Sequence, residues 1–336
     1  MYRSLRPLLF RLDPETAHRL TLGLLRLAGR LPPWLWVLQA MFSVPGKPVQ
    51  AFGLKFKNPV GLAAGYDKDG IAIQGLAALG FGHIEIGTVT PRPQPGNPRP
   101  RVFRLVEDEA VINRMGFPGK GMSKVASQMS SVVRRPSSII LGVNLGKNKD
   151  TPLEESTNDY ISLVRTFSPL ADYLAINVSS PNTIGLRRLQ GRAMLEELLK
   201  AVNETRTSLP VPRPMLVKLA PDLSNNELDD AIDVILYAGM DGVILTNTTL
   251  ERAGLHSCHQ GETGGLSGAP LRGRSELVLS QVLKRLDGHL PVVSVGGIMS
   301  AEDAKRRLDM GAALVQVYTG LVYAGPGLVQ KIIKAV

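Results

Sequence analysis

Eight short apolar segments between residues 59 and 320 constrain the fold of this chain more than any other feature of its sequence. Most are hydrophobic at nearly every position, as strands buried on both faces are. They are 59–65, 83–89, 138–145, 173–180, 214–220, 241–248, 291–297 and 314–320. Apolar residues recur at helical spacing between them, for example at 153–168, 189–208, 224–238, 275–287 and 301–310. Eight such units predict an α/β protein folded as a (β/α)8 TIM barrel rather than an open sheet.

Two further segments alternate apolar and polar residues, and they predict short accessory β-hairpins outside the barrel. "VQAFGLKF" (49–56) turns at Gly53 before the first barrel strand. "RVFRLVEDEAVINR" (101–114) follows the second strand and turns at the acidic residues 107–109.

The first 43 residues predict a helical extension to the barrel. Asp13 is placed as an N-cap, with Pro14 at the first helical position, and an apolar stripe of leucines follows. Prolines 32 and 33 end that helix, and the apolar residues 34–42 open another. We therefore divide the chain into an amphipathic segment, 1–43, and a catalytic barrel domain, 44–336. The segment is either a cap packed on its own domain or a module that rests on a membrane surface.

Charge and cysteine content narrow the classes of partner. The net charge is +10, which suits nucleic acid, an anionic membrane or anionic small ligands. Aromatic residues make up only 5% and the basic residues are dispersed, so we expect no nucleic-acid role. The single cysteine, Cys258, excludes an internal disulfide, and "HSCH" (256–259) lacks the further ligands of a closed zinc site, so no metal is expected. No apolar run is long enough to span a bilayer, and no secretory signal is evident.

Polar residues follow all eight apolar segments. In a barrel of this type the active site is built at the C-terminal ends of the strands. The residues at these ends are Lys68, Thr88, Asn144, Asn177, Ser180, Lys218, Thr246, Asn247, Thr248, Gly296, Gly297, Tyr318 and Thr319. Any one of them could be a simple turn residue, but their recurrence after every strand favours a functional site.

These residue types suit a phosphate and a flat heterocycle. Glycines at 296–297 and 320 follow the last two strands, where this fold commonly binds phosphate, and "TGGLSG" (263–268) predicts more flexible backbone with free donors. Asn144 and Asn177 offer neutral donors and acceptors. Lys218 either stabilises an anionic reduced flavin or forms a structural salt bridge inside the barrel.

Ser180 lacks the partners of a hydrolytic nucleophile. The sequence has no GxSxG motif and no histidine at the C-terminal end of a predicted strand, since His83 begins its strand. The Ser180 hydroxyl either accepts a proton from an oriented carbon acid, as a hydride leaves the adjacent carbon, or only shapes the turn before Pro181.

Ten motifs together resemble one family over nearly the whole chain, in order. They are "NPVGLAAGYDKDG", "FGHIEIGTVTPRPQPGNPRPR", "INRMGF", "GVNLGKNK", "NVSSPNTIGLR", "VKLAPDLS", "DGVILTNTT", "TGGLSGAPL", "VVSVGGI" and "LVQVYTGLVYAGP". The sequence is similar to the quinone-dependent (class 2) dihydroorotate dehydrogenases of bacterial type. The resemblance implies an FMN-containing barrel that oxidises dihydroorotate to orotate in pyrimidine (UMP) biosynthesis and passes the electrons to a membrane quinone.

The resemblance also implies roles for individual residues. Ser180 is the base that removes the C5 proton while hydride moves from C6 to flavin N5. The substrate set is Lys68, Asn113, Arg114, Met115, Gly116, Phe117, Asn177, Asn182, Asn247 and Thr248. The FMN set is Ala64, Gly65, Tyr66, Asp67, Lys68, Thr88, Asn144, Asn177, Lys218, Thr246, Gly268, Gly297, Tyr318 and Thr319. The loop after Ser180 is expected to be a lid, with Gly185 as a hinge.

Serine at 180, where the soluble classes have cysteine, together with the extension, is typical of the membrane class. The resemblance implies a two-helix quinone access in residues 1–43, an anionic membrane surface as partner, and a peripheral location on the cytoplasmic side of the cell membrane. A monomer or weak dimer is expected. Tyr66 and Ile184 stand where leucine and proline are expected in this family. Two alternatives stay open: a related FMN barrel reductase acting on tRNA uridines, and a non-catalytic phosphate-binding barrel docked on membranes.

Overall fold

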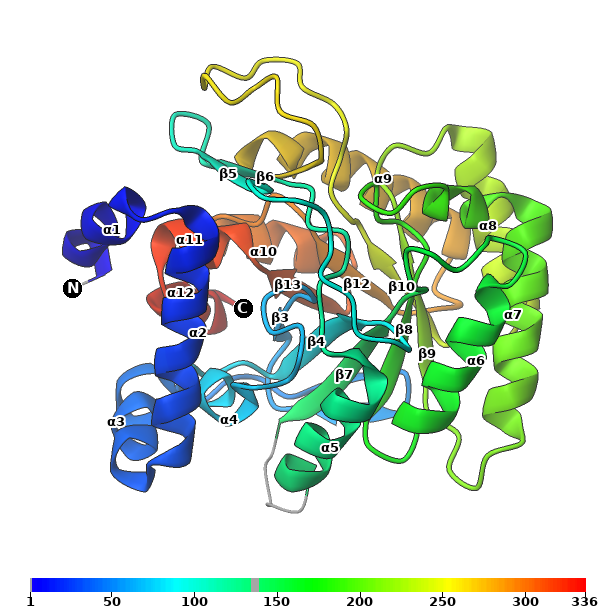
Figure 1. Cartoon of the computed structure of the whole chain (residues 1–336), viewed down its shortest axis with the longest axis horizontal. Coiled ribbons are helices and arrows are strands. Elements are labelled where there is room, and N and C mark those ends of the chain that lie inside the picture. Colours follow the sequence, from blue (N-terminus) through cyan, green and yellow to red (C-terminus); the bar gives the residue numbers. More distant parts are fainter. Residues whose placement is uncertain (1, 134–138) are drawn as a thin grey trace.

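A closed barrel of eight parallel strands forms the centre of the computed structural model, which describes residues 2–133 and 139–336 (Figure 1). Around the barrel the strands follow the order β3, β4, β7, β8, β9, β10, β12, β13. Their bounds are Val60–Leu62, His83–Val89, Ile140–Leu145, Tyr173–Asn177, Met215–Leu219, Gly242–Leu245, Val292–Val295 and Leu314–Val317. The predicted TIM barrel is confirmed.

Several strands end earlier than the apolar segments suggest. Strand β8 ends at Asn177 and β10 at Leu245, so Ser180 and Thr246–Thr248 leave the sheet. Their side chains line the cavity described below, while the backbone N–H groups of Thr246 and Asn247 still donate to the carbonyl oxygens of Val295 and Leu219. Residue 138, where one predicted strand begins, lies outside the described residues.

Helices pack around the barrel, and two of them start with a reciprocal cap. They are α4 (Ile73–Ala77), α5 (Gly121–Val133), α6 (Ser156–Phe167), α7 (Arg192–Thr207), α8 (Asn225–Tyr237), α9 (Arg272–Leu286), α10 (Ala301–Asp309), α11 (Thr319–Ala324) and α12 (Gly327–Ala335). Short 3-10 turns span Leu186–Gln190 and Ala269–Leu271. Ser224 begins α8 and Ser300 begins α10, each paired with an acidic residue three positions on.

Both predicted hairpins are present. Strands β1 (Val49–Ala51) and β2 (Leu54–Phe56) pair antiparallel, and Phe56 packs edge-on against His83 at the N-terminal end of the barrel. Strands β5 (Val102–Leu105) and β6 (Ala110–Asn113) form the second hairpin.

The prediction of a flexible 263–268 segment is wrong. Residues Gly265–Gly268 form strand β11, which pairs antiparallel with β6 and completes a three-stranded sheet. The backbone donors and acceptors of this segment are therefore engaged in a sheet ladder.

The N-terminal extension forms three helices. They are α1 (Tyr2–Arg11), α2 (Pro14–Arg30) and α3 (Pro32–Phe42). The Asp13 carboxylate accepts the Thr16 N–H at 2.9 Å, so the predicted cap is confirmed. Helix α3 starts two residues earlier than predicted, because proline is well tolerated in the first turn of a helix.

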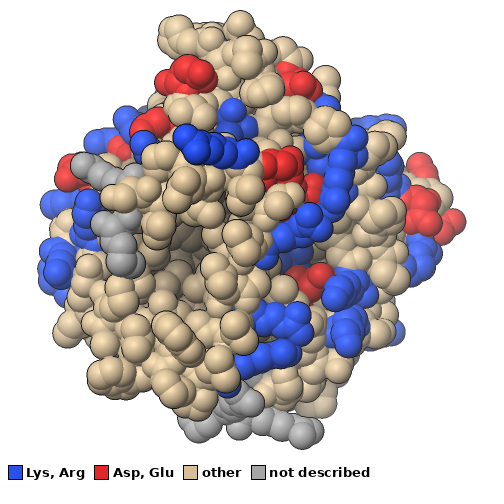
Figure 2. All heavy atoms as spheres, turned by 60° about the vertical axis from the view of Figure 1, so that its left-hand side comes forward, with Lys and Arg blue, Asp and Glu red and all other residues tan. Residues whose placement is uncertain are grey.

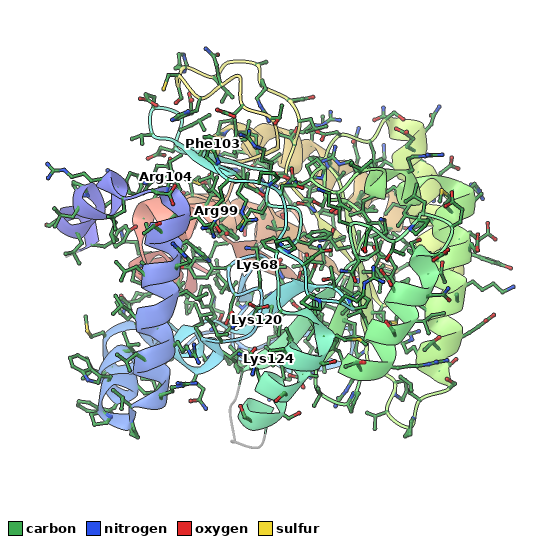
Figure 3. The ribbon with its side chains drawn as sticks, in the orientation of Figure 1. Lys68, Arg99, Phe103, Arg104, Lys120 and Lys124 are labelled. Atoms are coloured by element: carbon green, nitrogen blue, oxygen red, sulfur yellow. The ribbon has the colours of Figure 1, made fainter. Side chains whose placement is uncertain are left out.

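The extension is docked on the barrel by close backbone packing and by ion pairs. Helix α2 lies against α4, where a Cβ on Gly75 would be 2.1 Å from the Leu25 carbonyl oxygen. Near the start of α2, Glu15 accepts from Arg101 and Arg99, both at 2.8 Å. Arg104 of β5 donates to backbone carbonyls at the end of α1 and just after it. Figure 3 shows Arg99 and Arg104 beside the upper end of α2.

Candidate active site

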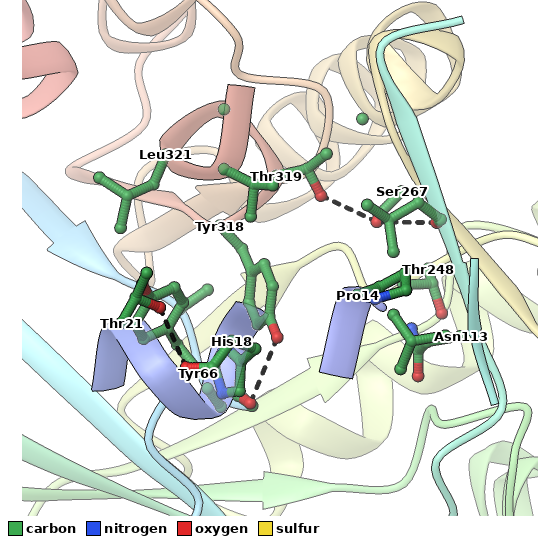
Figure 4. A pocket seen from close by; sticks show the side chains of 18 of the residues that line it. Pro14, His18, Thr21, Tyr66, Asn113, Thr248, Ser267, Tyr318, Thr319 and Leu321 are labelled. Carbon is green, nitrogen blue, oxygen red and sulfur yellow. Dashed lines mark hydrogen bonds between the residues drawn. The ribbon is translucent and has the colours of Figure 1, made fainter. Parts of the chain in front are cut away.

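A cavity of about 890 Å³ joins the C-terminal ends of the barrel strands to the helical extension. Its walls come from these strand ends, from the β5–β6–β11 sheet and from α1, α2 and α3. In Figure 4, His18 and Thr21 of α2 face Tyr66 and Tyr318, while Asn113 and Thr248 lie on the far side. The extension is therefore part of the cavity wall.

Twenty of the predicted site residues line this cavity. They are Ala64, Gly65, Tyr66, Lys68, Thr88, Asn113, Met115, Gly116, Phe117, Asn177, Ser180, Asn182, Lys218, Thr246, Asn247, Thr248, Gly268, Gly297, Tyr318 and Thr319. Segments that are far apart in the sequence thus converge on one cavity, as expected for residues at the C-terminal ends of barrel strands.

Three predicted residues lie outside the lining. Both carboxylate oxygens of Asp67 accept backbone N–H groups, from Ile71 at 2.9 Å and Ala72 at 2.8 Å, so this side chain shapes the turn after β3. Arg114 points to Glu262 at 2.6 Å and stacks over Phe103. Asn144 lies one layer below the cavity, within the network described next.

Buried amides and hydroxyls form a continuous network beneath the cavity. The side-chain Oδ1 of Asn144 accepts from the Thr88 hydroxyl at 2.6 Å and from the Asn177 Nδ2 at 2.9 Å. The side-chain Oδ1 of Asn177 accepts from the Ser179 hydroxyl, and the Asn247 Nδ2 donates to the same hydroxyl at 2.9 Å. Because each amide is fixed by its neighbours, the polar edges that face the cavity are held in place before anything binds.

Lys218 is anchored to this network by a buried carboxylate. Its Nζ lies 3.9 Å from Glu85 Oε1, and the same oxygen accepts from Asn144 at 2.8 Å. The other Glu85 oxygen accepts from Tyr173 and Gln316. Burial lowers the pKa of Lys218, and the charge of Glu85 opposes that shift. Lys218 therefore forms the internal salt bridge and also lines the cavity, and its role toward a flavin stays a prediction.

Ser180 lies at the start of the loop that covers one side of the cavity. Its Oγ accepts the N–H of Asn182 at 3.2 Å. The Asn182 side chain donates to Asn113 Oδ1 at 3.2 Å, which brings two predicted substrate residues into contact. Gly185 has φ +71°, a conformation that suits glycine at the proposed hinge.

Lys68 supplies a cation whose charge depends on pH just above neutrality. Burial lowers the pKa of Lys68 to about 8, and the nearby Glu15 carboxylate opposes that shift. Its Nζ donates to the Gly65 carbonyl oxygen. The cation thus stands where the substrate set and the extension meet.

The part of the cavity bounded by the extension is mostly apolar. The resemblance implies a quinone access in this segment, but no individual residue of it was predicted to line a site. Its lining includes Leu5, Leu8, Leu9, Leu12, Leu20, Leu24, Leu25, Leu38 and Phe42, with Tyr2, Glu15, His18, Thr21 and Arg104 as polar exceptions. Burial lowers the pKa of His18 to about 4, with the charge of Lys68 adding to that shift, so the ring is neutral at pH 7. The sequence signals for this half were the leucine stripe and the quinone access that the resemblance implies for residues 1–43.

Tyr66, where the family resemblance suggested leucine, links the two halves. Its ring packs edge-on against His18 and Tyr318, at centroid distances of 4.9 and 5.5 Å. Its hydroxyl hydrogen-bonds to Thr21 of α2 (Figure 4). Gln316 and Ser267 also line the cavity and were missed. Gln316 is a single polar residue inside an apolar segment, and Ser267 lies in a glycine-rich segment whose backbone alone was considered.

A family model described as dihydroorotate dehydrogenase matches residues 48–336, which contain the whole barrel. The chain belongs to the dihydroorotate dehydrogenase family. The resemblance drawn from the motifs is thereby confirmed. Among the residues that the structure describes, no cluster of metal-ligand side chains is found, and no helix is both long and apolar enough to cross a bilayer.

Members of the dihydroorotate dehydrogenase family are similar to this chain over almost its full length. A protein named dihydroorotate dehydrogenase (quinone) from Roseiflexus sp. (strain RS-1) is 50% identical over 334 residues, which is 99% of this chain and 92% of that protein. One of the same name from Acidithiobacillus ferrooxidans is 50% identical over 342 residues, 99% and 93% of the two chains. The structure of the Eimeria tenella enzyme in complex with ferulenol has a TM-score of 0.88 at 38% identity, covering 96% and 90%. Because the bacterial alignments cover 99% of the chain, they include most of the extension.

Proposed function

We propose that this chain oxidises (S)-dihydroorotate to orotate in pyrimidine (UMP) biosynthesis, with FMN as the hydride acceptor and a membrane quinone as the final electron acceptor. The observation that carries the proposal is the shared cavity, which has a polar half at the strand ends and an apolar half in the extension. A small polar anion suits the first half, and a lipophilic ring and tail suit the second.

The residues that the structure describes fit a flavin. Gly65, Gly268 and Gly297 have φ values of +98°, +102° and +74°, so backbone rather than side chains borders the cavity at three points. At Gly297 a Cβ would be 2.3 Å from the Arg272 Cα, so glycine is required there. Thr88, Asn177 and Lys218 would hold the ring, with the lysine charge near its pyrimidine edge.

The substrate would be held between Lys68 and the asparagines of the polar half. Asn113 and Asn182 already contact one another, and Asn247 is fixed by Ser179 and by its bond to the Thr248 N–H. Amide side chains match the donor and acceptor pattern of a pyrimidine ring, and the Lys68 cation matches a carboxylate.

Ser180 would receive the C5 proton on Oγ while its own hydroxyl proton passes to solvent. The Asn182 N–H donates to Oγ and would stabilise negative charge there during the transfer. Closure of the loop after Ser180 would exclude bulk water from the carbon that gives up the hydride.

We also propose that residues 1–43 act as a quinone-access module on the cytoplasmic face of the cell membrane, and that 44–336 act as the catalytic domain. Trp34 and Trp36 are 61% and 69% exposed, and exposed leucines of α1 and α2 continue this apolar side. Figure 2 shows this side as a broad hollowed surface without charge, bordered by Lys and Arg. Such a surface suits the interface of an anionic bilayer.

The membrane proposal can be tested by sedimentation with vesicles that contain anionic lipid. Replacing Trp34 and Trp36 together by serine should release most of the protein from the vesicles without changing flavin reduction. Undiminished binding by that variant would refute the role of this surface.

The catalytic proposal is tested by anaerobic mixing. Purified protein should be yellow, dihydroorotate should bleach it, and a short-chain ubiquinone should then restore the colour. A colourless protein after incubation with FMN, or a flavin that dihydroorotate leaves oxidised, would refute the proposal.

A further inference from the structure

Asn97 lies outside the cavity lining, yet its side-chain NH2 group and its backbone N–H bond to segments that build the substrate half. Its Nδ2 donates to the carbonyl oxygens of Arg114 at 2.9 Å and of Asn182 at 3.2 Å. Its backbone N–H donates to the Met115 carbonyl oxygen at 2.9 Å, and its Oδ1 accepts from Lys149 at 2.9 Å. One amide side chain thus ties the 113–117 segment to the loop that follows Ser180.

Close packing reinforces these bonds. A Cβ on Gly116 would lie 2.8 Å from the Asn97 side-chain nitrogen, so the 113–117 segment rests directly on this amide. Asn113 and Asn182, which contact one another across the cavity, therefore belong to two walls that share one support. The spacing of those walls sets the fit of any small planar ligand between them.

Asn97 is in turn held by the helical extension. The Arg101 guanidinium donates through Nη1 to the carbonyl oxygens of Pro95 at 2.7 Å and Asn97 at 2.9 Å. Its other nitrogens grip Glu15 of α2, with Nη2 to Oε1 at 2.8 Å and Nε to Oε2 at 3.1 Å. Arg101 and Glu15 are both buried, and bidentate pairs of this kind fix orientation as well as distance.

We propose that Asn97 is a positioning residue for the substrate, and that Glu15 sets its position through Arg101. The extension then does more than border the apolar half of the cavity: its docking also fixes the spacing of the walls around the substrate. This inference rests on the proposed function, since it concerns the affinity of the same pocket for orotate.

The test uses the full-length protein with FMN bound and titrates orotate while flavin absorbance is recorded. Wild-type protein that binds no flavin, or whose flavin spectrum ignores orotate, would refute the proposed function itself. Where wild type responds, Asn97→Asp is the decisive variant, because it keeps an acceptor for Lys149 but loses both Nδ2 donations and sets a carboxylate against two carbonyl oxygens.

We expect Asn97→Asp to raise the Kd for orotate and the KM for dihydroorotate about tenfold or more, with a smaller change in kcat. Flavin content and melting temperature should stay near those of wild type. Asn226→Asp, at an exposed position on α8, adds the same charge elsewhere and should leave both constants unchanged. A Kd for Asn97→Asp within twofold of wild type would overturn the proposal.

The role of the extension is tested with Glu15→Gln. This variant should raise the Kd for orotate about threefold, because a neutral amide grips Arg101 more weakly. Arg99→Gln is the matched control: it removes another ion pair to the same carboxylate but has no bond to residues 95–97. Equal effects of these two variants on the Kd would overturn the link through Arg101.

The double variant Glu15→Gln with Asn97→Asp separates a shared path from two independent effects. If Glu15 acts through Asn97, the double variant should bind orotate no more weakly than Asn97→Asp alone. Effects that multiply would refute the path. Should Asn97→Asp fail to retain flavin, the comparison of Glu15→Gln with Arg99→Gln decides the question.

Discussion

The contact between α2 and α4 gives the sharpest stability prediction. A Cβ on Gly75 would lie 2.1 Å from the Leu25 carbonyl oxygen, whereas real Cβ contacts essentially never fall below 3.0 Å. In Gly75→Ala the backbone of α2 must therefore retreat by about 0.9 Å, since both contacting groups are main chain or fixed to it. Overpacking of this kind costs about 1 to 3 kcal/mol.

This cost should appear as local opening of α2. A loss of about 1 to 3 kcal/mol corresponds to a rise of roughly fivefold to 150-fold in amide hydrogen exchange across α2, because tenfold is about 1.4 kcal/mol. Leu25 lines the cavity, so the KM for a quinone should rise as well. Exchange measured by mass spectrometry on the full-length protein resolves the effect by segment.

Gly23→Ala on the same helix is the matched control. A Cβ at Gly23 meets nothing within 4 Å, so alanine should stabilise the helix by about 1 kcal/mol and slow its exchange. If Gly75→Ala left the exchange of α2 unchanged while the protein stayed folded, the close packing of α2 on α4 would be wrong.

Three further predictions address the polar half of the cavity. Ser180→Ala should retain flavin but slow its reduction by dihydroorotate by about 10² to 10⁴, the usual contribution of a positioned base, and unchanged stopped-flow reduction would exclude this residue as the base. The Kd for orotate should increase as the pH rises through about 8, because Lys68, with its pKa lowered to about 8, loses its positive charge there. Lys68→Met should bind orotate more weakly and show a flatter dependence of the Kd on pH. An equally steep rise of the Kd in that variant would assign the titration to another group. Glu85→Gln should lower the free energy of unfolding by about 3 to 5 kcal/mol, since it leaves the Lys218 cation buried without a partner charge, and a urea midpoint equal to that of wild type would contradict this account.

Much of the barrel could be predicted from the sequence because each strand carries its own local signal. Apolar runs and cap residues such as Asp13 depend on near neighbours, and they placed the strands and the start of α2 correctly. The convergence of Ser180 and Asn247 in one cavity followed from the rule that active sites occupy the C-terminal ends of barrel strands.

Pairing between distant segments could not be predicted. Strand β11 forms only because residues 265–268 meet β6, about 150 positions earlier in the chain, and a glycine-rich segment carries no local mark of that partner. Asp67 was predicted to border the cofactor, but its carboxylate caps the following turn, a choice that depends on side-chain direction. Which leucines of the extension line the apolar half of the cavity could not be predicted, since leucines that line a chamber and leucines that fill a core have the same periodicity.

The buried amide network beneath the cavity limits which substitutions the sequence can accept at these positions. Asn144 bonds to Thr88, Asn177 and Glu85 at once, so exchanging it for a residue of different hydrogen-bonding capacity leaves groups on two other strands, β4 and β8, without this partner. Relatives that vary at one of these positions should carry compensating changes at the others, and lineages should inherit the set as a block. Covariation among these positions would then indicate which ligand a relative binds better than the residue at any single position does.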